Sequence, residues 1–233
     1  MQRIAINPDQ IQDKQITLTS QQQHYLYRVL RLQKGDKFIA MDGMGKWWLS
    51  QLDNTNALIL QQLTVETELP IAVTLMVALP KGNGFDDIVR CCTELGVTCI
   101  APVISDRTLL KPSSQKLERW HRIAREAAEQ SERTKVPQIL EPVAFNKSVV
   151  SFTNFEKYIC VARGDSPHLL QCLQNQDNKQ VVIATGAEGG WTEKEVGIAL
   201  QNGFKMASLG RRILRAVTAP IVVMSLISAV SEV

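Results

Sequence analysis

The sequence has little of what a secreted, membrane-spanning or metal-binding protein needs. Its five cysteines are odd in number and show no Cys-x-x-Cys spacing, which argues against a disulfide framework and a zinc site. The three histidines, His24, His121 and His168, are scattered and indicate neither a metal site nor a catalytic triad. The opening residues lack the apolar core of a signal peptide, and the longest apolar stretch, Ile221 to Val230, is about half of a membrane span. We therefore expect a cytoplasmic protein with reduced cysteines, without a bound metal and without a membrane.

Charge of one sign is also not abundant. The chain has 26 Lys plus Arg against 23 Asp plus Glu, and the resulting net charge of +3 is too small to identify a nucleic-acid partner. The apolar fraction of 45% and the length of 233 residues are typical of a globular protein with one large domain or two modest ones. Local motifs must therefore carry the functional argument.

Two glycine-bearing loops near the C-terminus organise the chain. An apolar run at 181–184 passes through Gly186-Ala187-Glu188-Gly189-Gly190 into a helix that a Thr192/Glu195 capping box begins. A second segment expected to be a short strand, 204–209, leads into Gly210 and then into a last apolar helix. Glycine lets a ligand lie against bare backbone amides, so the paired loops are candidates for holding a nucleotide-like molecule. The spacing fits neither a P-loop nor the dinucleotide fingerprint, and two plain turns remain the alternative.

The central part of the chain alternates between strands and helices. Strands are expected at 71–79, 97–103 and 158–162, and helices at 85–95, 114–131 and 167–173. The polar segment 66–70, which ends in proline, is the best domain boundary. This alternation predicts an α/β domain with a parallel sheet from residue 71 to residue 233.

Residues 1–70 are expected to form a small β-rich domain with one helix. Ser20 and Gln23 predict a capping box at the start of that helix, with Leu26, Val29 and Leu30 on its apolar face. Strands are expected at 37–41, 46–52 and 57–62, with a hairpin between the first two. One of the adjacent tryptophans Trp47 and Trp48 must point outward, and it could stack on a base or simply pack at an interface.

An ordered set of short motifs runs through the whole chain. The motifs are Arg28-Val29-Leu30-Arg31-Leu32 with Gly35-Asp36, Pro80-Lys81-Gly82, Glu94-Leu95-Gly96-Val97, Ser105-Asp106-Arg107, Ala128-Glu129-Gln130-Ser131 with Arg133, the glycine loop at 186–190, and Leu209-Gly210-Arg211-Arg212-Ile213-Leu214-Arg215 followed by Thr218-Ala219. In this order and spacing the sequence resembles the bacterial 16S rRNA (uracil-N3)-methyltransferase family. That family belongs to the SPOUT class of S-adenosylmethionine-dependent methyltransferases.

The resemblance implies a fold, a cofactor and a set of partners. The expected architecture is a PUA-like β-barrel RNA-binding domain, residues 1–70, followed by a SPOUT methyltransferase domain, residues 71–233, with a trefoil knot near its C-terminus. The expected reaction moves a methyl group from S-adenosylmethionine to N3 of a specific uridine in 16S rRNA of the small ribosomal subunit. The expected assembly is a homodimer.

The resemblance also implies which residues act. Arg215 and Glu129 are expected at the reacting atoms, where an arginine can stabilise an anionic uracil and a carboxylate can accept its proton. For Ile213 and Leu214 core packing remains open, and for the arginines and Gln130 a solvated surface remains open. The expected cofactor residues are Thr185, Gly186, Glu188, Gly189, Gly190, Leu209, Gly210, Ile213 and Leu214, and a side chain at Gly189 is expected to block the cofactor. The expected RNA-binding residues are Arg28, Arg31, Lys81, Arg107, Gln130 and Arg133.

Two positions depart from the family pattern. Ala187 stands where the family usually has proline, and Val217 stands where it usually has an acid. These departures motivate a second hypothesis, an RNA-binding or ribosome-assembly protein that keeps the fold without catalysis. A third hypothesis is a SPOUT enzyme with another RNA target. Affinity for S-adenosylmethionine separates the second hypothesis from the enzyme, and mapping the modified nucleotide separates the third.

Overall fold

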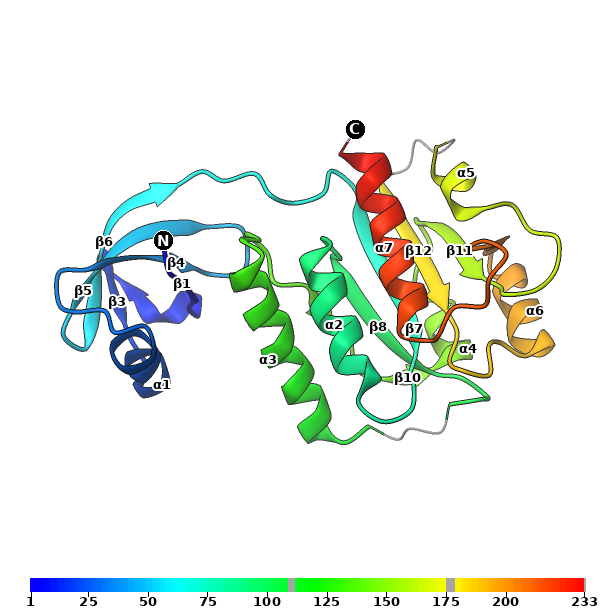
Figure 1. The fold of residues 1–233 in the computed structure, drawn as a ribbon, viewed down its shortest axis with the longest axis horizontal. Helices are drawn as coiled ribbons and strands as arrows, with labels where there is room; N and C mark the ends of the chain where they lie inside the picture. The colour runs from blue at the N-terminus through cyan, green and yellow to red at the C-terminus, as the bar shows by residue number, and fades with distance from the viewer. Residues whose placement is uncertain (109–111, 175–178, 233) are drawn as a thin grey trace. The chain divides into compact units, whose positions relative to one another are not determined.

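The chain divides into two compact units in a computed structural model that describes residues 1–108, 112–174 and 179–232 (Figure 1). The first unit consists of Met1–Glu68 together with Arg125–Val136. The second consists of Leu69–Ala124 together with Pro137–Val233. Residues 125–136, which the sequence placed in the second domain, thus pack with the first unit.

The first unit is built on a six-stranded sheet with the order β1-β4-β5-β6-β3-β2. Its pairs are antiparallel except for β1 and β4. The predicted hairpin is confirmed, since β4 and β5 pair in antiparallel register, and Trp47 is buried while Trp48 is only partly covered. The strands are β1 (Arg3–Ala5), β2 (Ile11–Gln12), β3 (Gln15–Thr17), β4 (Lys37–Met41), β5 (Trp47–Asp53) and β6 (Asn56–Leu63), and a short 3-10 helix, η1 (Pro8–Gln10), precedes β2.

The helical segment of this unit corrects the sequence prediction in two ways. The capping box of α1 (Ser20–His24) is formed by Thr19 and Gln22, one residue earlier than predicted. The helix then widens into a π-helical turn, η2 (Tyr25–Val29), in which the N–H of Leu30 bonds the carbonyl of Tyr25 at 2.9 Å. The wider turn rotates Val29 outward, so Val29 is 56% exposed while Leu26 is fully buried.

The last turn of α3 (Ser114–Gln130) completes the first unit. Ala128 is buried in a cluster with Ala5, Ile39 and Met41. The Glu129 carboxylate accepts the backbone N–H of Ala5 at 2.7 Å. These contacts explain why the segment beyond residue 124 belongs with the strands of the N-terminal part.

A parallel sheet forms the second unit, with the order β10-β8-β7-β12-β11-β13 and β9 paired to β8. Every strand pair in this sheet is parallel, which confirms the predicted α/β class. The strands are β7 (Ala72–Ala78), β8 (Cys99–Ile104), β9 (Gln138–Ile139), β10 (Val143–Ala144), β11 (Glu156–Cys160), β12 (Gln180–Thr185) and β13 (Lys205–Ala207).

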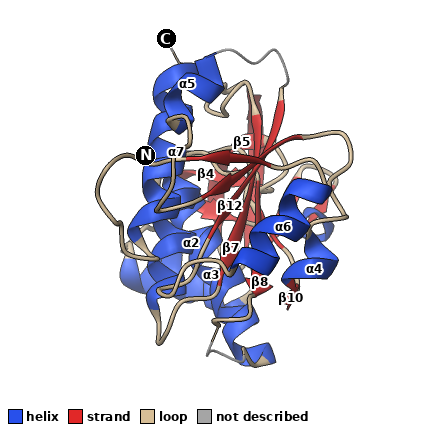
Figure 2. Cartoon of the chain, turned by 90° about the vertical axis from the view of Figure 1, so that its right-hand side faces the viewer, coloured by secondary structure: helices blue, strands red, loops and turns tan. Residues whose placement is uncertain are grey.

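Helices cover both faces of this sheet (Figure 2). On one face lie α2 (Gly84–Glu94), α5 (Leu169–Gln174) and α7 (Thr218–Ser231), with α7 packed against the other two and against β12. On the other face lie α4 (Phe145–Ser148) and α6 (Glu193–Gln201), which contact each other. The predicted helices agree with α2, α3, α5, α6 and α7 to within a few residues, whereas α4 was not predicted. The trefoil knot stays a prediction from the family resemblance.

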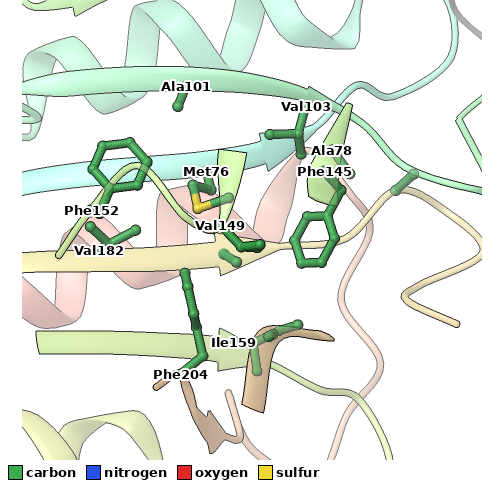
Figure 3. Packing of buried hydrophobic residues seen from close by; sticks show 13 residues of the cluster. Met76, Ala78, Ala101, Val103, Phe145, Val149, Phe152, Ile159, Val182 and Phe204 are labelled. Carbon is green, nitrogen blue, oxygen red and sulfur yellow. The ribbon is translucent and has the colours of Figure 1, made fainter. Parts of the chain in front are cut away.

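Buried side chains fix the strands of this sheet against the α4 and α6 face. Met76 of β7 and Val182 of β12 lie beside Phe145, Phe152 and Phe204 in one cluster (Figure 3). Because interiors of this kind are close-packed, the strands hold a fixed register and their ends are placed firmly. The loops that follow the strands are therefore presented together at one edge.

Candidate functional site at the carboxyl ends of the parallel strands

The candidate site is made by loops that follow four parallel strands. These loops are 79–83 after β7, 105–108 after β8, 186–192 after β12 and 208–217 after β13. Parallel strands place all these loops at the same edge of the sheet, the edge where open α/β sheets bind their ligands.

The first glycine loop is a tight turn that requires its glycines. A Cβ on Gly186 would lie 3.1 Å from the Cα of Gly190, and Gly190 itself has a φ of +68°. The N–H of Gly190 closes the turn by donating to the carbonyl of Ala187 at 2.8 Å. The predicted residues at 186–190 therefore do form one compact loop directly after β12.

Thr185 lies at the base of this loop with an unused hydroxyl. Its side chain is fully buried, and its Oγ1 has no hydrogen-bond partner within the part of the chain that the structure describes. A buried polar atom without a partner costs about 1–3 kcal/mol, so such an atom beside a ligand loop marks a position where a ligand can supply the bond. Thr185 and the glycine turn together fit a polar, nucleotide-like cofactor.

The second glycine loop adds an apolar wall. Gly210 has a φ of +106°, and its N–H donates to Ser208 Oγ at 3.1 Å. Leu209 and Leu214 are partly buried, whereas Ile213 is 66% exposed. Apolar side chains commonly line small-molecule sites. The exposed Ile213 side chain, close in sequence to Gly210, could therefore pack against a flat ring of a ligand.

Direct contacts join the loop after β7 to both glycine loops. The N–H of Lys81 donates to Glu188 Oε1 at 3.0 Å. A Cβ on Gly84 would lie 2.7 Å from the Cγ2 of Val217, so the end of the second loop packs closely on the start of α2. Glu188, which was expected at the cofactor, thus has one oxygen engaged in holding two loops together.

The loop after β8 also contacts the first glycine loop. The Arg107 guanidinium, expected at RNA, donates to the carbonyl of Gly189 and reaches the carbonyl of Trp191 at 3.5 Å. The N–H of Asp106 donates to Glu195 Oε1 at 2.9 Å. Three strand-end loops are therefore cross-linked around the predicted cofactor residues.

The remaining predicted residues of the second unit, Arg215 and Lys81, have exposed side chains. The Arg215 carbonyl accepts the first N–H groups of α7, while its guanidinium makes no hydrogen bond within the described ranges. Both side chains stand on loops at the carboxyl edge.

Five of the predicted residues lie in the first unit. Arg28, Arg31 and Gln130 are exposed, and Arg31 follows the π-helical turn with a φ of +57°. Glu129 is largely buried; burial raises the pKa of its carboxyl, although the N–H of Ala5 acts in the opposite direction.

Arg133 is the predicted RNA contact whose setting differs most from the expectation. It is 3% exposed, and its Nη2 and Nε lie 2.5 and 3.2 Å from Glu68 Oε2. Burial alone would raise the pKa of Glu68, but hydrogen bonds from Arg133, Lys135 and Thr134 bring that pKa below its ordinary range. In this structure the guanidinium is buried and bonded to a carboxylate of the same unit.

Sequence reasoning missed several residues that shape the site. Glu195 was identified only as a helix-capping residue, and that capping box is confirmed, yet its second contact to Asp106 was not foreseen. Trp191 packs on Phe145 with ring centroids 4.6 Å apart. His168 forms a bridge with Ser208 of the second glycine loop. The Thr192/Glu195 spacing was the only sequence signal for any of these contacts.

Two other features are absent from the described residues. Among them, no group of three or more His, Cys, Asp or Glu side chains is placed to hold a metal ion. None of the helices within those residues has the length and apolar character to cross a membrane.

A parallel sheet with glycine loops at its carboxyl edge, joined to a small β unit, is typical of α/β enzymes that bind a nucleotide-like molecule. The chain belongs to an RNA methyltransferase family. The family model described as an RNA methyltransferase domain matches residues 67–228, and the one described as an RNA methyltransferase PUA domain matches residues 18–61. The resemblance seen in the sequence and the PUA-like class of the first unit are thereby confirmed.

Individual relatives agree with this assignment. The chain is 49% identical to a Synechocystis protein named ribosomal RNA small subunit methyltransferase E, over 99% of this chain and 78% of that one. It is 31% identical to the Bacillus subtilis protein of the same name, over 100% and 98% of the two chains. A crystal structure of the Neisseria gonorrhoeae protein of that name, bound to S-adenosylmethionine, matches with a TM-score of 0.88 and 29% identity over 98% of this chain and 97% of that one.

Proposed function

We propose that this chain methylates N3 of one specific uridine in 16S rRNA of the small ribosomal subunit, with S-adenosylmethionine as the methyl donor. Support comes from the names of its relatives and from the cofactor bound to the similar Neisseria gonorrhoeae protein. The observation on which the proposal rests most heavily is the tight glycine turn that directly follows the buried, unpartnered Thr185 hydroxyl.

The residues present fit this cofactor. Backbone amides of 186–189 and of Leu209 can face its polar edges, whereas those of Gly190 and Gly210 already bond Ala187 and Ser208. The Thr185 hydroxyl can donate or accept a bond to it. The flat adenine would lie against Leu209, Ile213 and Leu214, which would explain the exposure of Ile213. When bound, S-adenosylmethionine supplies an electrophilic methyl group. Orientation of two reactants by such a site can contribute roughly 7 kcal/mol or more.

Uracil must lose its N3 proton, and the developing negative charge needs a partner. Arg215 is the best candidate, because its exposed side chain lies on the second glycine loop and a guanidinium can donate hydrogen bonds to an anionic carbonyl oxygen. Glu129 is proposed as a proton acceptor, consistent with the raised pKa of its carboxyl. Its bond to the Ala5 N–H leaves the second carboxylate oxygen for that task.

Recognition of the RNA is assigned to both parts of the chain. We propose that residues 1–70 form the RNA-binding domain and residues 71–233 the methyltransferase domain. Arg28 and Arg31 on the first unit and Lys81 on the second are exposed cations available to phosphates. We further propose that the enzyme works in the cytoplasm as a homodimer, as the family resemblance implies.

The proposal can be tested with small ribosomal subunits that lack the native methylation. After incubation with the purified protein and S-adenosylmethionine, the RNA is digested and its nucleosides are separated by mass spectrometry. We expect 3-methyluridine to appear in small-subunit RNA and to be absent from large-subunit RNA treated in the same way. Cofactor binding without any methylated nucleoside would refute the methylation, and absence of both would favour an RNA-binding protein without catalysis.

A further inference from the structure

Arg107 lies across the first glycine loop instead of pointing away from it. A Cβ on Gly189 would lie 2.9 Å from the Cδ of Arg107 and 3.4 Å from its Cβ. The aliphatic part of the arginine therefore covers the face of Gly189 where any other residue would carry its side chain. The backbone of Gly189 does not itself demand glycine, because its φ lies outside the left-handed region.

The guanidinium of Arg107 is directed at backbone acceptors of the same loop. It donates to the carbonyl of Gly189 and lies 3.5 Å from the carbonyl of Trp191. Arginine presents several donors on one rigid plane, so a single side chain can hold two carbonyls on either side of Gly190. Arg107, which follows β8, therefore holds the turn that follows β12.

Glu195 holds the backbone from which Arg107 projects. Its side chain is 3% exposed, and its Oε1 accepts the N–H of Asp106 at 2.9 Å. Its Oε2 accepts the N–H of Thr192 at 2.8 Å and the Thr192 hydroxyl at 2.9 Å. One buried carboxylate thereby connects the loop after β8, next to Arg107, with Thr192 at the end of the first glycine loop.

From these contacts we infer that Arg107 is a positioning residue of the cofactor loop, and that position 189 is glycine in order to admit the Arg107 side chain. The inference replaces two expectations from the sequence, an RNA contact for Arg107 and direct obstruction of the cofactor by bulk at Gly189. It rests on the proposed cofactor site, because the loop that Arg107 holds is the one assigned to S-adenosylmethionine.

A double-mutant cycle tests the inference. Affinity for S-adenosylmethionine is measured by calorimetry, without RNA, for the wild type, Arg107→Ala, Gly189→Ala and the double variant. Each single change should weaken binding by about 3- to 10-fold, which is the range expected when hydrogen bonds to a partly exposed charged group are lost. Gly189→Ala should have under about twofold effect once Arg107 is already alanine, because the methyl group acts by displacing that side chain.

Several controls make the result specific. Arg90→Ala removes a cation that pairs with Asp87 on its own helix, and it should leave the affinity unchanged. Arg107→Lys keeps the aliphatic stem and one donor, so it should recover part of the loss. In steady-state assays Arg107→Ala should raise KM for S-adenosylmethionine more than KM for the RNA.

Three results would overturn the inference. One is an additive cycle, in which Gly189→Ala weakens binding equally with and without Arg107, since that would mean the methyl group obstructs the cofactor directly. Another is unchanged cofactor affinity in Arg107→Ala with weakened RNA binding, which would return Arg107 to the RNA. The third is equal affinity in all four proteins. If the wild type itself binds no S-adenosylmethionine, the proposed function fails first.

Discussion

Replacing Arg133 by methionine tests whether this residue holds the first unit together. The side chain is buried, and its Nε and Nη2 bond the same Glu68 oxygen, Oε2. Removing one partner of a buried ion pair typically costs about 3–5 kcal/mol. Glu68 is 21% exposed and keeps its bonds from Lys135 and Thr134, so we expect the lower end of that range, about 3 kcal/mol. For a chain of this size, that corresponds to a melting temperature lower by roughly 6–12 °C.

Urea unfolding followed by circular dichroism measures the loss. Arg125→Ala is the matched control, since its exposed side chain makes one long hydrogen bond of 3.3 Å to Asn7 and should cost under about 0.5 kcal/mol. A loss below about 1 kcal/mol for Arg133→Met would refute the structural role. Weaker RNA binding at unchanged stability would restore the predicted RNA contact.

The pH dependence of Glu68→Gln offers an independent check. The folded-state pKa of Glu68 is lowered, so the stability that its charge contributes is present above the unfolded pKa of about 4.3 and is lost as pH falls through the folded value. Glu68→Gln should therefore be less stable than the wild type at neutral pH. The two proteins should converge in acid. A constant difference across the whole range would contradict this assignment.

Three further predictions concern the site. Thr185→Val should weaken S-adenosylmethionine binding by about 3- to 10-fold without lowering stability, because the hydroxyl has no partner in the protein; unchanged affinity in calorimetry would remove Thr185 from the site. Arg215→Ala should slow methyl transfer by at least about 100-fold while cofactor affinity stays within about twofold, and a fully active variant would exclude Arg215 from the mechanism. The pKa of Glu129 is raised, so its stabilising contribution is present below the ordinary pKa and is lost as pH rises through the folded value. Glu129→Gln, whose amide oxygen can still accept the Ala5 N–H, should therefore be at least as stable as the wild type at neutral pH yet lose activity; full activity would exclude Glu129 as the proton acceptor.

Local sequence signals predicted most of the secondary structure. Apolar runs located β7, β8, β11 and β12 because each is buried in a parallel sheet, and the Thr192/Glu195 spacing located the start of α6. The start of α1 was predicted one residue late because Ser20 and Gln23 fit the capping-box pattern as well as the actual pair, Thr19 and Gln22. The π-helical turn was missed because it arises from hydrogen bonding that apolar spacing does not report.

Contacts between distant segments were beyond sequence reasoning. Arg133 and Glu68 are far apart in the chain, and both carry charges that usually stay in solvent, so only the fold shows that they form a buried pair. In the same way the glycines of the first loop indicated a ligand, while the structure shows that one of them, Gly189, accommodates Arg107. Glycine in a sequence does not reveal which neighbour requires it.

The most direct test of the central claim is methyl transfer itself. Undermethylated small subunits are incubated with labelled S-adenosylmethionine and either the wild type or Arg215→Ala, and the modified position is mapped by reverse-transcription arrest, since N3 methylation blocks Watson-Crick pairing. We expect label incorporation by the wild type with one new arrest at a uridine, and neither with the variant. Intact subunits and folded wild-type protein that yield no label and no arrest would contradict it.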